Sequence, residues 1–532
     1  MFKLIPLPKS VQYFDGKFFS FVKESGEKPN LPESILLELE QFAKLSGCFK
    51  FWENEKNFSV DLNGSDEEYG KEGSKINIDE NGIRITAACE QGAFYACQTV
   101  KQIVLQYPEN IPFAVIEDSP VFDYRAFMLD VGRYFYTVNE VKHFIDLMAL
   151  HKLNVFHFHL TEDQGWRIEI KKYPLLTQKG SKRSHTNFGC IPRSGFYTQE
   201  EIKEIVRYAH SKHIKVVPEF DIPGHTVSAI ACYPYLSCFD RKLSVATHWG
   251  VKHDILCAGK ESTYRFVYDV LDEIAELFPD GIIHIGGDEA FKMRWNICPN
   301  CQAEIEKNGL KDSEELQQLF MTKVNAYLQK KGIKTVMWNW DDIEPTKWLD
   351  PSIAWNLCGV SKEKLPVIRQ EMKAGRNMIL TSSFPYYLDF PFGWVDLKFA
   401  YEYNPIELFD EKDLESVWGI EAPLWTEYVP NMKKAHYMTF PRLAAVAENA
   451  WCKQEQKNWN DFLSRMDDYY KILALYDVKP ASLSRALPSK LEGKATSLWF
   501  NRRVFHWQGL HNLIDDALVG AKAKKMKKAS KH

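Results

Sequence analysis

The sequence lacks several features that define whole classes of protein. It has no apolar run of about 18 residues or more, so no transmembrane helix is expected. Residues 1–9 lack the unbroken apolar segment of a signal peptide. Lys and Arg number 67 against 71 Asp and Glu, without the basic excess usual in nucleic-acid-binding proteins. We therefore expect a cytoplasmic protein that binds neither nucleic acid nor membrane.

The eleven cysteines show no disulfide framework. Their odd number and scattered positions fit a reduced intracellular protein better than a disulfide-bonded one. Only Cys298 and Cys301 have the spacing of a metal or redox pair, and no second Cys-x-x-Cys supplies the two further ligands of a zinc site. We expect neither metal nor cofactor, although the sequence leaves open whether Cys298 and Cys301 bind a metal.

Apolar and aromatic residues are plentiful, and their arrangement indicates the fold. Hydrophobic residues make up 45% of the chain and aromatic residues 14%, which excludes disorder as its main state. Eight short apolar runs are predicted as strands: 126–131, 154–160, 215–220, 281–289, 334–340, 352–357, 377–383 and 417–425. Segments with helical periodicity lie between them: 138–152, 199–213, 262–278, 313–331 and 361–374.

Continuous apolar runs alternating with helices are typical of parallel strands buried on both faces. Eight of them predict an α/β fold with a closed (β/α)8 TIM barrel. The competing doubly wound sheet usually has a glycine-rich phosphate turn after its first strand. The chain has Gly132-Arg133-Tyr134-Phe135 there, which is not such a turn. The barrel is therefore favoured.

The chain divides into four predicted parts. Residues 1–118 have short alternating segments and one helical stretch, as in a small α+β domain, and residues 119–451 form the catalytic barrel. Residues 452–520 are helical and are expected to pack on the barrel. Six lysines in residues 521–532 predict a solvated, disordered basic tail.

Carboxylates and tryptophans gather where the predicted strands end. Active sites of such barrels lie at the C-terminal ends of the strands. Asp288 and Glu289 follow Gly286 and Gly287 at one such end. Cleavage of a glycosidic bond needs a carboxylic acid to protonate the leaving oxygen, usually together with a second carboxylate. Since neighbouring residues of an extended segment point in different directions, the two acids could address different atoms of one sugar.

Two other functions remain open from these residues. His157 and His159 lie on one face of a strand, and with His225 they could bind the metal of a metal-dependent barrel hydrolase. The alternative is that these histidines orient neighbouring carboxylates. The chain could also be a sugar-binding protein without turnover, although the presence of both Asp288 and Glu289 argues against this.

A set of motifs in consistent order resembles the β-N-acetylhexosaminidases of glycoside hydrolase family 20, from Ile5 to Trp451. The motifs are Asp118-Ser-Pro-Val-Phe-Asp-Tyr-Arg125, Met128-Leu-Asp-Val-Gly-Arg133, Lys152 to Arg167, Pro218-Glu-Phe-Asp-Ile-Pro-Gly-His225, His284-Ile-Gly-Gly-Asp-Glu289, Tyr386-Tyr-Leu-Asp389, Glu421-Ala-Pro-Leu-Trp-Thr-Glu427 and Pro441 to Trp451. So many ordered matches are not expected by chance.

The resemblance implies an exo-acting, retaining enzyme that releases terminal β-linked N-acetylglucosamine or N-acetylgalactosamine from a glycan. The substrate's own 2-acetamido group would be the nucleophile. Glu289 would be the general acid and then the base. Asp288 would hold the acetamido N–H, and Tyr387 its oxygen.

The resemblance also assigns the residues that would bind the sugar. Trp338, Trp355 and Trp425 would form the walls of the pocket, and Arg133, Asp389 and Glu427 would bind the 3-, 4- and 6-hydroxyls. Glu162, Asp163 and His225 would support the catalytic pair.

Three departures from the family pattern raise questions. The family usually has Asp-Asp where this chain has Glu162-Asp163, so the acid that pairs with His225 is undetermined. Gly132 stands where Ser or Ala is more usual. Trp338 and Trp340 fit the family pattern in different registers. The gluco or galacto preference, the natural glycan and the oligomeric state are not predicted.

Overall fold

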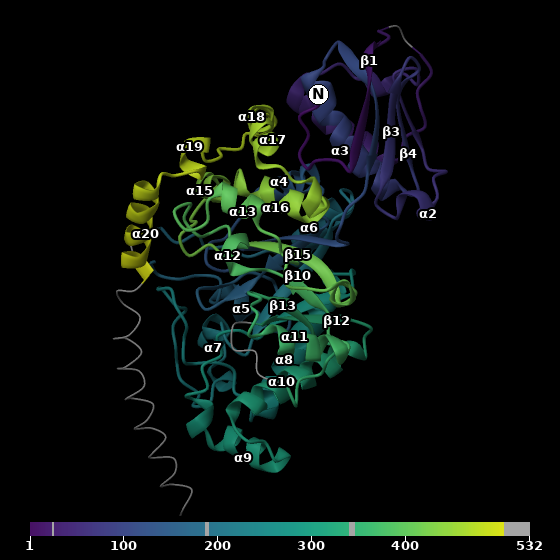
Figure 1. The fold of residues 1–532 in the computed structure, drawn as a ribbon. Helices are drawn as coiled ribbons and strands as arrows, with labels where there is room; N and C mark the ends of the chain where they lie inside the picture. The colour runs from purple at the N-terminus through teal and green to yellow at the C-terminus, as the bar shows by residue number, and fades with distance from the viewer. Residues whose placement is uncertain (24–25, 187–190, 340–345, 505–532) are drawn as a thin grey trace, which may run out of the picture.

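A computed structural model describes residues 1–23, 26–186, 191–339 and 346–504. The first part is an α+β domain around a five-stranded mixed sheet with the order β1-β5-β3-β4-β2 (Figure 1). The strands are β1 (Ser10–Ser20), β2 (Phe58–Asp61), β3 (Ser74–Asp79), β4 (Gly82–Ala87) and β5 (Asn110–Asp118). Helices α1 (Glu33–Ser46) and α3 (Glu90–Gln106) pack together, and α3 lies against β3, β4 and β5. A short α2 (Asp66–Tyr69) precedes β3.

Eight parallel strands then close into a barrel in the order β10-β11-β12-β13-β14-β15-β6-β7. Each of the eight predicted apolar runs overlaps one of these strands, so the predicted barrel is confirmed. The strands are β6 (Tyr124–Asp130), β7 (Val155–His159), β10 (Lys215–Ile222), β11 (Ile282–Gly286), β12 (Lys334–Asn339), β13 (Ala354–Leu357), β14 (Met378–Leu380) and β15 (Val417–Leu424).

All five predicted barrel helices are present, with bounds that differ from the prediction by at most four residues: α4 (Val138–Leu150), α6 (Gln199–His210), α8 (Glu261–Leu277), α10 (Ser313–Gln329) and α11 (Leu365–Lys373). The start of α6 shows why the local sequence forms a helix there. The Thr198 hydroxyl accepts the Glu201 N–H at 3.2 Å, and the Glu201 carboxylate accepts the Thr198 N–H at 2.8 Å. This capping box satisfies backbone groups that the first turn leaves unpaired.

The connections after β7, β10, β11 and β14 are long and carry short elements of their own. They contain β8 (Thr161–Glu162), β9 (Gly165–Trp166), α5 (Leu175–Gln178), α7 (Val227–Cys232), α9 (Pro299–Asn308), α12 (Ser383–Tyr386), α13 (Leu397–Glu402) and α14 (Glu411–Leu414). These connections follow the C-terminal ends of the strands, where a barrel places its active site.

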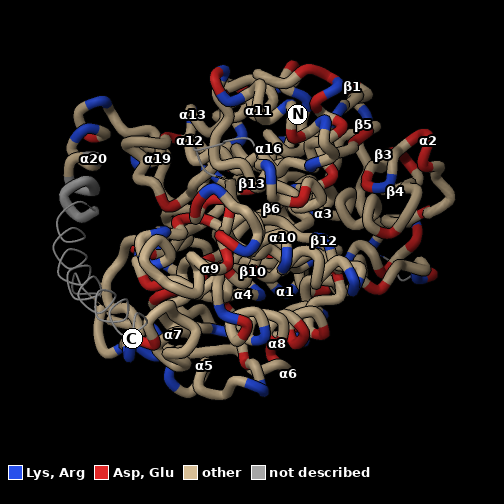
Figure 2. Tube along the Cα trace, turned by 90° about the horizontal axis from the view of Figure 1, so that it is seen from below, with Lys and Arg blue, Asp and Glu red and all other residues tan. Residues whose placement is uncertain are grey.

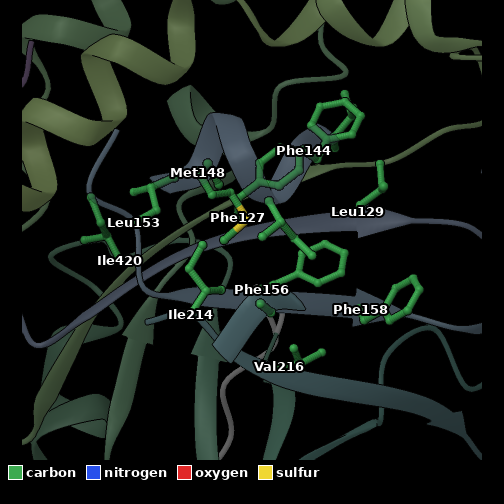
Figure 3. Close-up of a cluster of buried hydrophobic side chains, with 14 of the residues drawn as sticks. Phe127, Leu129, Phe144, Met148, Leu153, Phe156, Phe158, Ile214, Val216 and Ile420 are labelled. Atoms are coloured by element: carbon green, nitrogen blue, oxygen red, sulfur yellow. The ribbon is translucent and has the colours of Figure 1, made fainter. Parts of the chain in front are cut away.

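The barrel packs against its helices through an apolar layer. Figure 3 shows α4 lying over β6 and β7, with Phe127 and Phe144 between them. Their rings stack with centroids 5.3 Å apart, and both residues are fully buried. Replacing either by Ala would leave a cavity that costs about 3–5 kcal/mol of stability.

A buried ion cluster joins the N-terminal domain to the barrel. Glu38 of α1 binds the ammonium groups of Lys101 in α3 and of Lys212, which follows α6. All three side chains are at most 5% exposed. Removing one partner of such a group leaves an uncompensated buried charge, which is strongly destabilising. The cluster therefore fixes the two domains against each other.

After β15, the described chain continues as a series of helices; of the predicted helical segment 452–520, residues 505–520 lie outside the described residues. The helices are α15 (Met432–Thr439), α16 (Arg442–Trp451), α17 (Trp459–Ser464), α18 (Met466–Leu475), α19 (Leu483–Ala486) and α20 (Lys490–Val504). The predicted basic tail at 521–532 lies outside the described residues. No helix within the described ranges is long and apolar enough to cross a membrane. Acidic and basic residues are interspersed along the chain (Figure 2).

Candidate active site

Asp288 and Glu289 lie at the C-terminal end of β11, on a turn that requires glycine. Gly286 and Gly287 have φ values of 65° and 104°. A Cβ on Gly286 would lie 1.8 Å from the Asp221 carboxylate, so no other residue fits there. The turn directs the two acids into different surroundings: the Asp288 side chain is 6% exposed and that of Glu289 is 41% exposed. One acid is therefore buried and the other faces open space.

His225, which follows β10, connects the two acids. Its Nε2 atom lies 3.8 Å from Asp288 Oδ2 and 3.4 Å from Glu289 Oε2. Its Nδ1 atom lies 2.8 Å from Glu162 Oε1. Burial opposes protonation of the imidazole, but the neighbouring carboxylates, Glu162 foremost, raise the pKa of His225 well above its usual value. His225 is therefore a cation held between carboxylates.

The structure shows which acid of the Glu162-Asp163 pair binds His225. Besides its contact with His225, Glu162 Oε1 lies 2.6 Å from Arg133 Nη2. Burial opposes ionisation of Glu162, but Arg133 and His225 hold its pKa well below the usual range. Asp163 is 3.9 Å from His225 Nδ1 and accepts the Val227 N–H at 2.9 Å. Glu162 is thus the direct partner, and Asp163 fixes the start of α7.

The two unusual residues of this region touch each other. A Cβ on Gly132 would lie 2.6 Å from the Cβ of Glu162 and 3.0 Å from its Cγ. A side chain at position 132 would therefore displace Glu162 from Arg133 and His225. Glycine before the arginine and glutamate in place of aspartate are structurally coupled.

Burial makes Asp288 a weaker acid than an exposed aspartate. Desolvation foremost, together with repulsion from Glu289, raises its pKa to about 6, against the opposing effect of the His225 cation. Asp221 lies next to it and accepts the Gly287 N–H at 3.3 Å. Burial foremost, together with the Asp288 charge, raises the pKa of Asp221 well above its usual value. Asp288 consequently changes its charge within the pH range in which many enzymes are active.

Trp338, Trp425 and Tyr387 form an aromatic wall beside these acids. The ring centroids of Trp338 and Trp425 are 5.6 Å apart, and those of Tyr387 and Trp425 are 6.3 Å apart. The Arg133 guanidinium lies 4.9 Å from the Trp425 ring centroid. Cys358, at the end of β13, packs in the same cluster and accepts a hydrogen bond from the Tyr387 hydroxyl at 3.3 Å. Cys358 was not predicted.

The prediction that Trp355 lines the pocket is wrong. Side chains alternate across a strand, and on β13 Asn356 faces the barrel interior, where its amide donates to Glu421 at 2.9 Å. Trp355 faces the opposite side, is fully buried in the layer beneath the helices, and packs 4.5 Å from the Arg376 guanidinium. Trp338 lies in the wall, and its competitor Trp340 lies outside the described residues.

At the rim, Arg133 lies next to Glu427, and Glu427 lies near Asp389. Arg133 Nη2 is 3.6 Å from Glu427 Oε1. Burial raises the pKa of both acids, and the charge of Glu427 adds to the rise at Asp389. Two acids and one guanidinium around a common space can accept and donate hydrogen bonds to neighbouring hydroxyls.

Below the rim, the three histidines of the predicted metal hydrolase each contact carboxylates. His157 lies 3.0 Å from both Glu219 and Glu421, and His159 Nδ1 is 2.5 Å from Glu219 Oε2. These carboxylates, Glu421 foremost, overcome the effect of burial and raise the pKa of His157 to about 9. Metal ligation needs neutral imidazole, so this arrangement fits the interpretation that the histidines orient carboxylates.

Glu219 is a positioning residue whose role was not predicted. Besides binding His157 and His159, it accepts the Trp338 indole N–H at 2.6 Å. It therefore fixes Trp338, a member of the aromatic wall, from inside the barrel. Its position inside the Pro218–His225 motif was a signal, but the sequence did not show that its side chain reaches a tryptophan on another strand.

The comparisons with known proteins decide the family. Residues 122–454 match the family model "Glycosyl hydrolase family 20, catalytic domain", and residues 1–119 match "Glycosyl hydrolase family 20, domain 2". The chain belongs to glycosyl hydrolase family 20. By this membership it is a glycoside hydrolase, and the resemblance of its motifs is confirmed.

Family 20 relatives and structures cover most of the chain. A β-hexosaminidase of Porphyromonas gingivalis is 41% identical over 75% of this chain and 53% of its own length, so the chain spans about half of that relative. A β-hexosaminidase of Akkermansia muciniphila is 32% identical over 75% of this chain and 83% of its own. A solved exo β-N-acetylglucosaminidase of Vibrio harveyi, in complex with N-acetylglucosamine, aligns with a TM-score of 0.80 at 29% identity, covering 90% of this chain and 78% of that one.

Proposed function

We propose that this protein is an exo-acting, retaining β-N-acetylhexosaminidase that removes terminal β-linked N-acetylglucosamine or N-acetylgalactosamine from glycans, with the substrate's acetamido group as nucleophile. One observation supports this most: consecutive acids at the end of β11 lie in different environments around one cation, His225. Such a pair can divide the work on one sugar, because one acid is open to the leaving group and the other is buried.

Glu289 is the general acid in this proposal. It donates its proton to the glycosidic oxygen while the bond from that oxygen to the anomeric carbon breaks. The acetamido carbonyl oxygen attacks the same carbon and forms a bicyclic oxazolinium ion. Glu289, now ionised, takes a proton from a water that attacks the anomeric carbon and reopens the ring. Two displacements at one carbon retain its configuration.

Asp288 acts on the acetamido group. Its carboxylate accepts the amide N–H, which turns the carbonyl oxygen toward the anomeric carbon and stabilises the positive charge of the oxazolinium. Tyr387 would donate its hydroxyl proton, which otherwise goes to Cys358 Sγ, to the carbonyl oxygen. Since Asp288 is buried beside the His225 cation, its charge acts in surroundings where electrostatic interactions are strong.

The remaining pocket residues favour a terminal sugar. Trp338 and Trp425 offer aromatic faces to the pyranose C–H groups, and Arg133, Asp389 and Glu427 can bind its hydroxyls. Binding several hydroxyls of one ring is suited to a chain end. A Streptomyces plicatus β-hexosaminidase variant in complex with its product GlcNAc aligns at 29% identity over 90% of this chain, with a TM-score of 0.76, which supports this substrate class. The cytoplasmic location stays a prediction.

A series of nitrophenyl substrates tests the mechanism. We expect hydrolysis of the N-acetyl-β-glucosaminide and steadily slower turnover as fluorine atoms replace hydrogens of the acetyl group, because fluorine makes the carbonyl oxygen a poorer nucleophile. The β-glucoside, which has no acetamido group, is the control and should not be hydrolysed. Equal rates across the fluorinated series would contradict the proposal.

A further inference from the structure

Four cysteines meet at one point outside the active site. The Sγ atoms of Cys238, Cys257, Cys298 and Cys301 all lie within 4.8 Å of one another. Cys257 Sγ is 3.6 Å from Cys301 Sγ and 3.8 Å from Cys298 Sγ, and Cys238 Sγ is 3.9 Å from Cys301 Sγ. The four sulfur atoms thus occupy the corners of a small tetrahedron.

The spacing of the sulfur atoms matches a bound metal ion. With a Zn–S distance of about 2.3 Å, the sulfur atoms of a tetrahedral site are roughly 3.8 Å apart. A disulfide would require about 2.05 Å. We propose that these four cysteines bind one structural zinc ion.

The chemistry of the donor set favours zinc over other ions. Four sulfur ligands exclude calcium and magnesium, which prefer oxygen. All four cysteines are buried, with at most 4% exposure, so the site has no open coordination position for a substrate or a catalytic water. A polynuclear iron–sulfur cluster contains inorganic sulfide between its irons and would need a wider cage.

Three segments far apart in the sequence build the site. Cys238 follows the short helix Pro234–Leu236, and Cys257 lies where its N–H donates to the Leu236 carbonyl at 2.8 Å. Cys298 is the N-cap residue of α9, and Cys301 lies in its first turn. In the sequence, only this last pair has the spacing of metal ligands. The two other ligands are isolated cysteines, and their loop brings them to α9.

The backbone fits closely around the cluster. A Cβ on Gly259 would lie 2.2 Å from the carbonyl carbon of Asn300, so the loop that carries Cys257 lies directly against the first turn of α9. The Trp295 indole N–H donates to the Leu256 carbonyl at 2.9 Å, joining the same two loops. Such close packing brings the ligands together before metal binds.

The ion would connect the two loops that carry the catalytic groups. The loop after β10 begins near His225 and holds Cys238 and Cys257. The loop after β11 begins with Asp288 and Glu289 and holds Cys298 and Cys301. A bond from zinc to both loops would fix the distance between His225 and the acids, so the metal is a positioning element rather than a catalytic group.

Metal analysis of the purified protein tests the site directly. The full-length chain, purified without a metal-affinity column, should contain about one zinc ion per chain, as measured by inductively coupled plasma mass spectrometry. A mercurial reagent should release that zinc to a chromogenic chelator. The Cys298→Ser/Cys301→Ser double variant should contain none, and Cys232→Ser is the matched control, because Cys232 is buried in the same loop outside the cluster.

A second measurement applies if the double variant does not fold. Wild-type protein grown with cobalt should show the strong thiolate-to-cobalt charge-transfer absorption of a tetrahedral sulfur site. The proposal is overturned if native protein contains no zinc, if it contains iron instead, or if thiol titration in denaturant with a chelator finds only seven of the eleven cysteines, as two disulfides would leave. These readouts do not depend on glycosidase activity, so either proposal can fail alone.

Discussion

The active site and the four-cysteine site are built on the same two loops, after β10 and after β11, but they use buried polar groups differently. At the active site, cations and carboxylates alternate, from Arg133 through Glu162 and His225 to Asp288. At the cysteine site, four like ligands surround one point and need an external cation. The first arrangement balances its own charge and leaves one acid open to substrate. The second arrangement is closed to solvent and would stabilise the two loops.

The largest expected effect is the loss of the general acid. Glu289→Gln should lower kcat on an unactivated disaccharide by about 10²-fold or more, because general acid catalysis contributes roughly 10²–10⁴. Substrates with very good leaving groups should lose least. Glu306→Gln, on the exposed surface of α9, is the control and should keep wild-type turnover. Undiminished turnover of the disaccharide by Glu289→Gln would remove this residue from the mechanism.

Asp288→Asn should also slow the chemical step strongly, by about 10²-fold, and should act on kcat more than on KM. The wild-type activity should fall below pH about 6, where Asp288 becomes protonated. Since its folded pKa lies above the usual value for aspartate, ionisation of Asp288 opposes folding. The folded state is favoured while Asp288 is protonated, and this stabilisation is lost as the pH rises through about 6. The difference in Tm between Asp288→Asn and the wild type should therefore shift in favour of the variant above that pH. A change in KM alone would contradict the assignment.

Loss of the proposed zinc should have a smaller effect on catalysis than on stability. Cys298→Ser/Cys301→Ser should lower Tm clearly and kcat by about tenfold, with KM changed less, since the loops lose their link but the acids remain. Thermal denaturation and steady-state kinetics measure both. If the double variant lost zinc but kept the wild-type Tm, the metal would have no structural role.

His225→Gln sharpens the comparison, because it removes the cation between the acids. The positive charge of His225 lowers the pKa of Asp288. In the variant, the pKa of Asp288 should therefore be higher, and the acidic limb of the pH profile of kcat should move to higher pH. The pH profile of kcat measures the shift. Lys260→Gln, whose ammonium binds carbonyls beside Cys238, removes a cation from the same loop and should leave the limb in place. A shift in the opposite direction would show that His225 does not act electrostatically.

The smallest expected effect concerns Gly132. Gly132→Ala should cost about 1–3 kcal/mol, because its Cβ would press against Glu162. Tm and KM should both change, as Glu162 is displaced from Arg133. Combining Gly132→Ala with Glu162→Ala should recover part of the lost stability. Strict additivity of the two changes would show that the residues are not coupled.

The sequence by itself determined the barrel and most of the rim, because both depend on short-range patterns. Eight apolar runs predicted eight strands, and contiguous motifs placed His225, Asp288 and Glu289 at strand ends, where the parallel topology brings them together. Trp355 was predicted wrongly, since a strand's alternation shows two faces but not which one faces the barrel interior.

Only the tertiary structure decided which distant side chains meet. It placed Glu162, rather than Asp163, on His225 and against Gly132. It also brought Cys238 and Cys257 to Cys298 and Cys301, across as many as 63 positions of sequence. The physical reason is the same in both cases: the geometry of a long loop depends on packing against its neighbours, which leaves no periodic signal in the sequence.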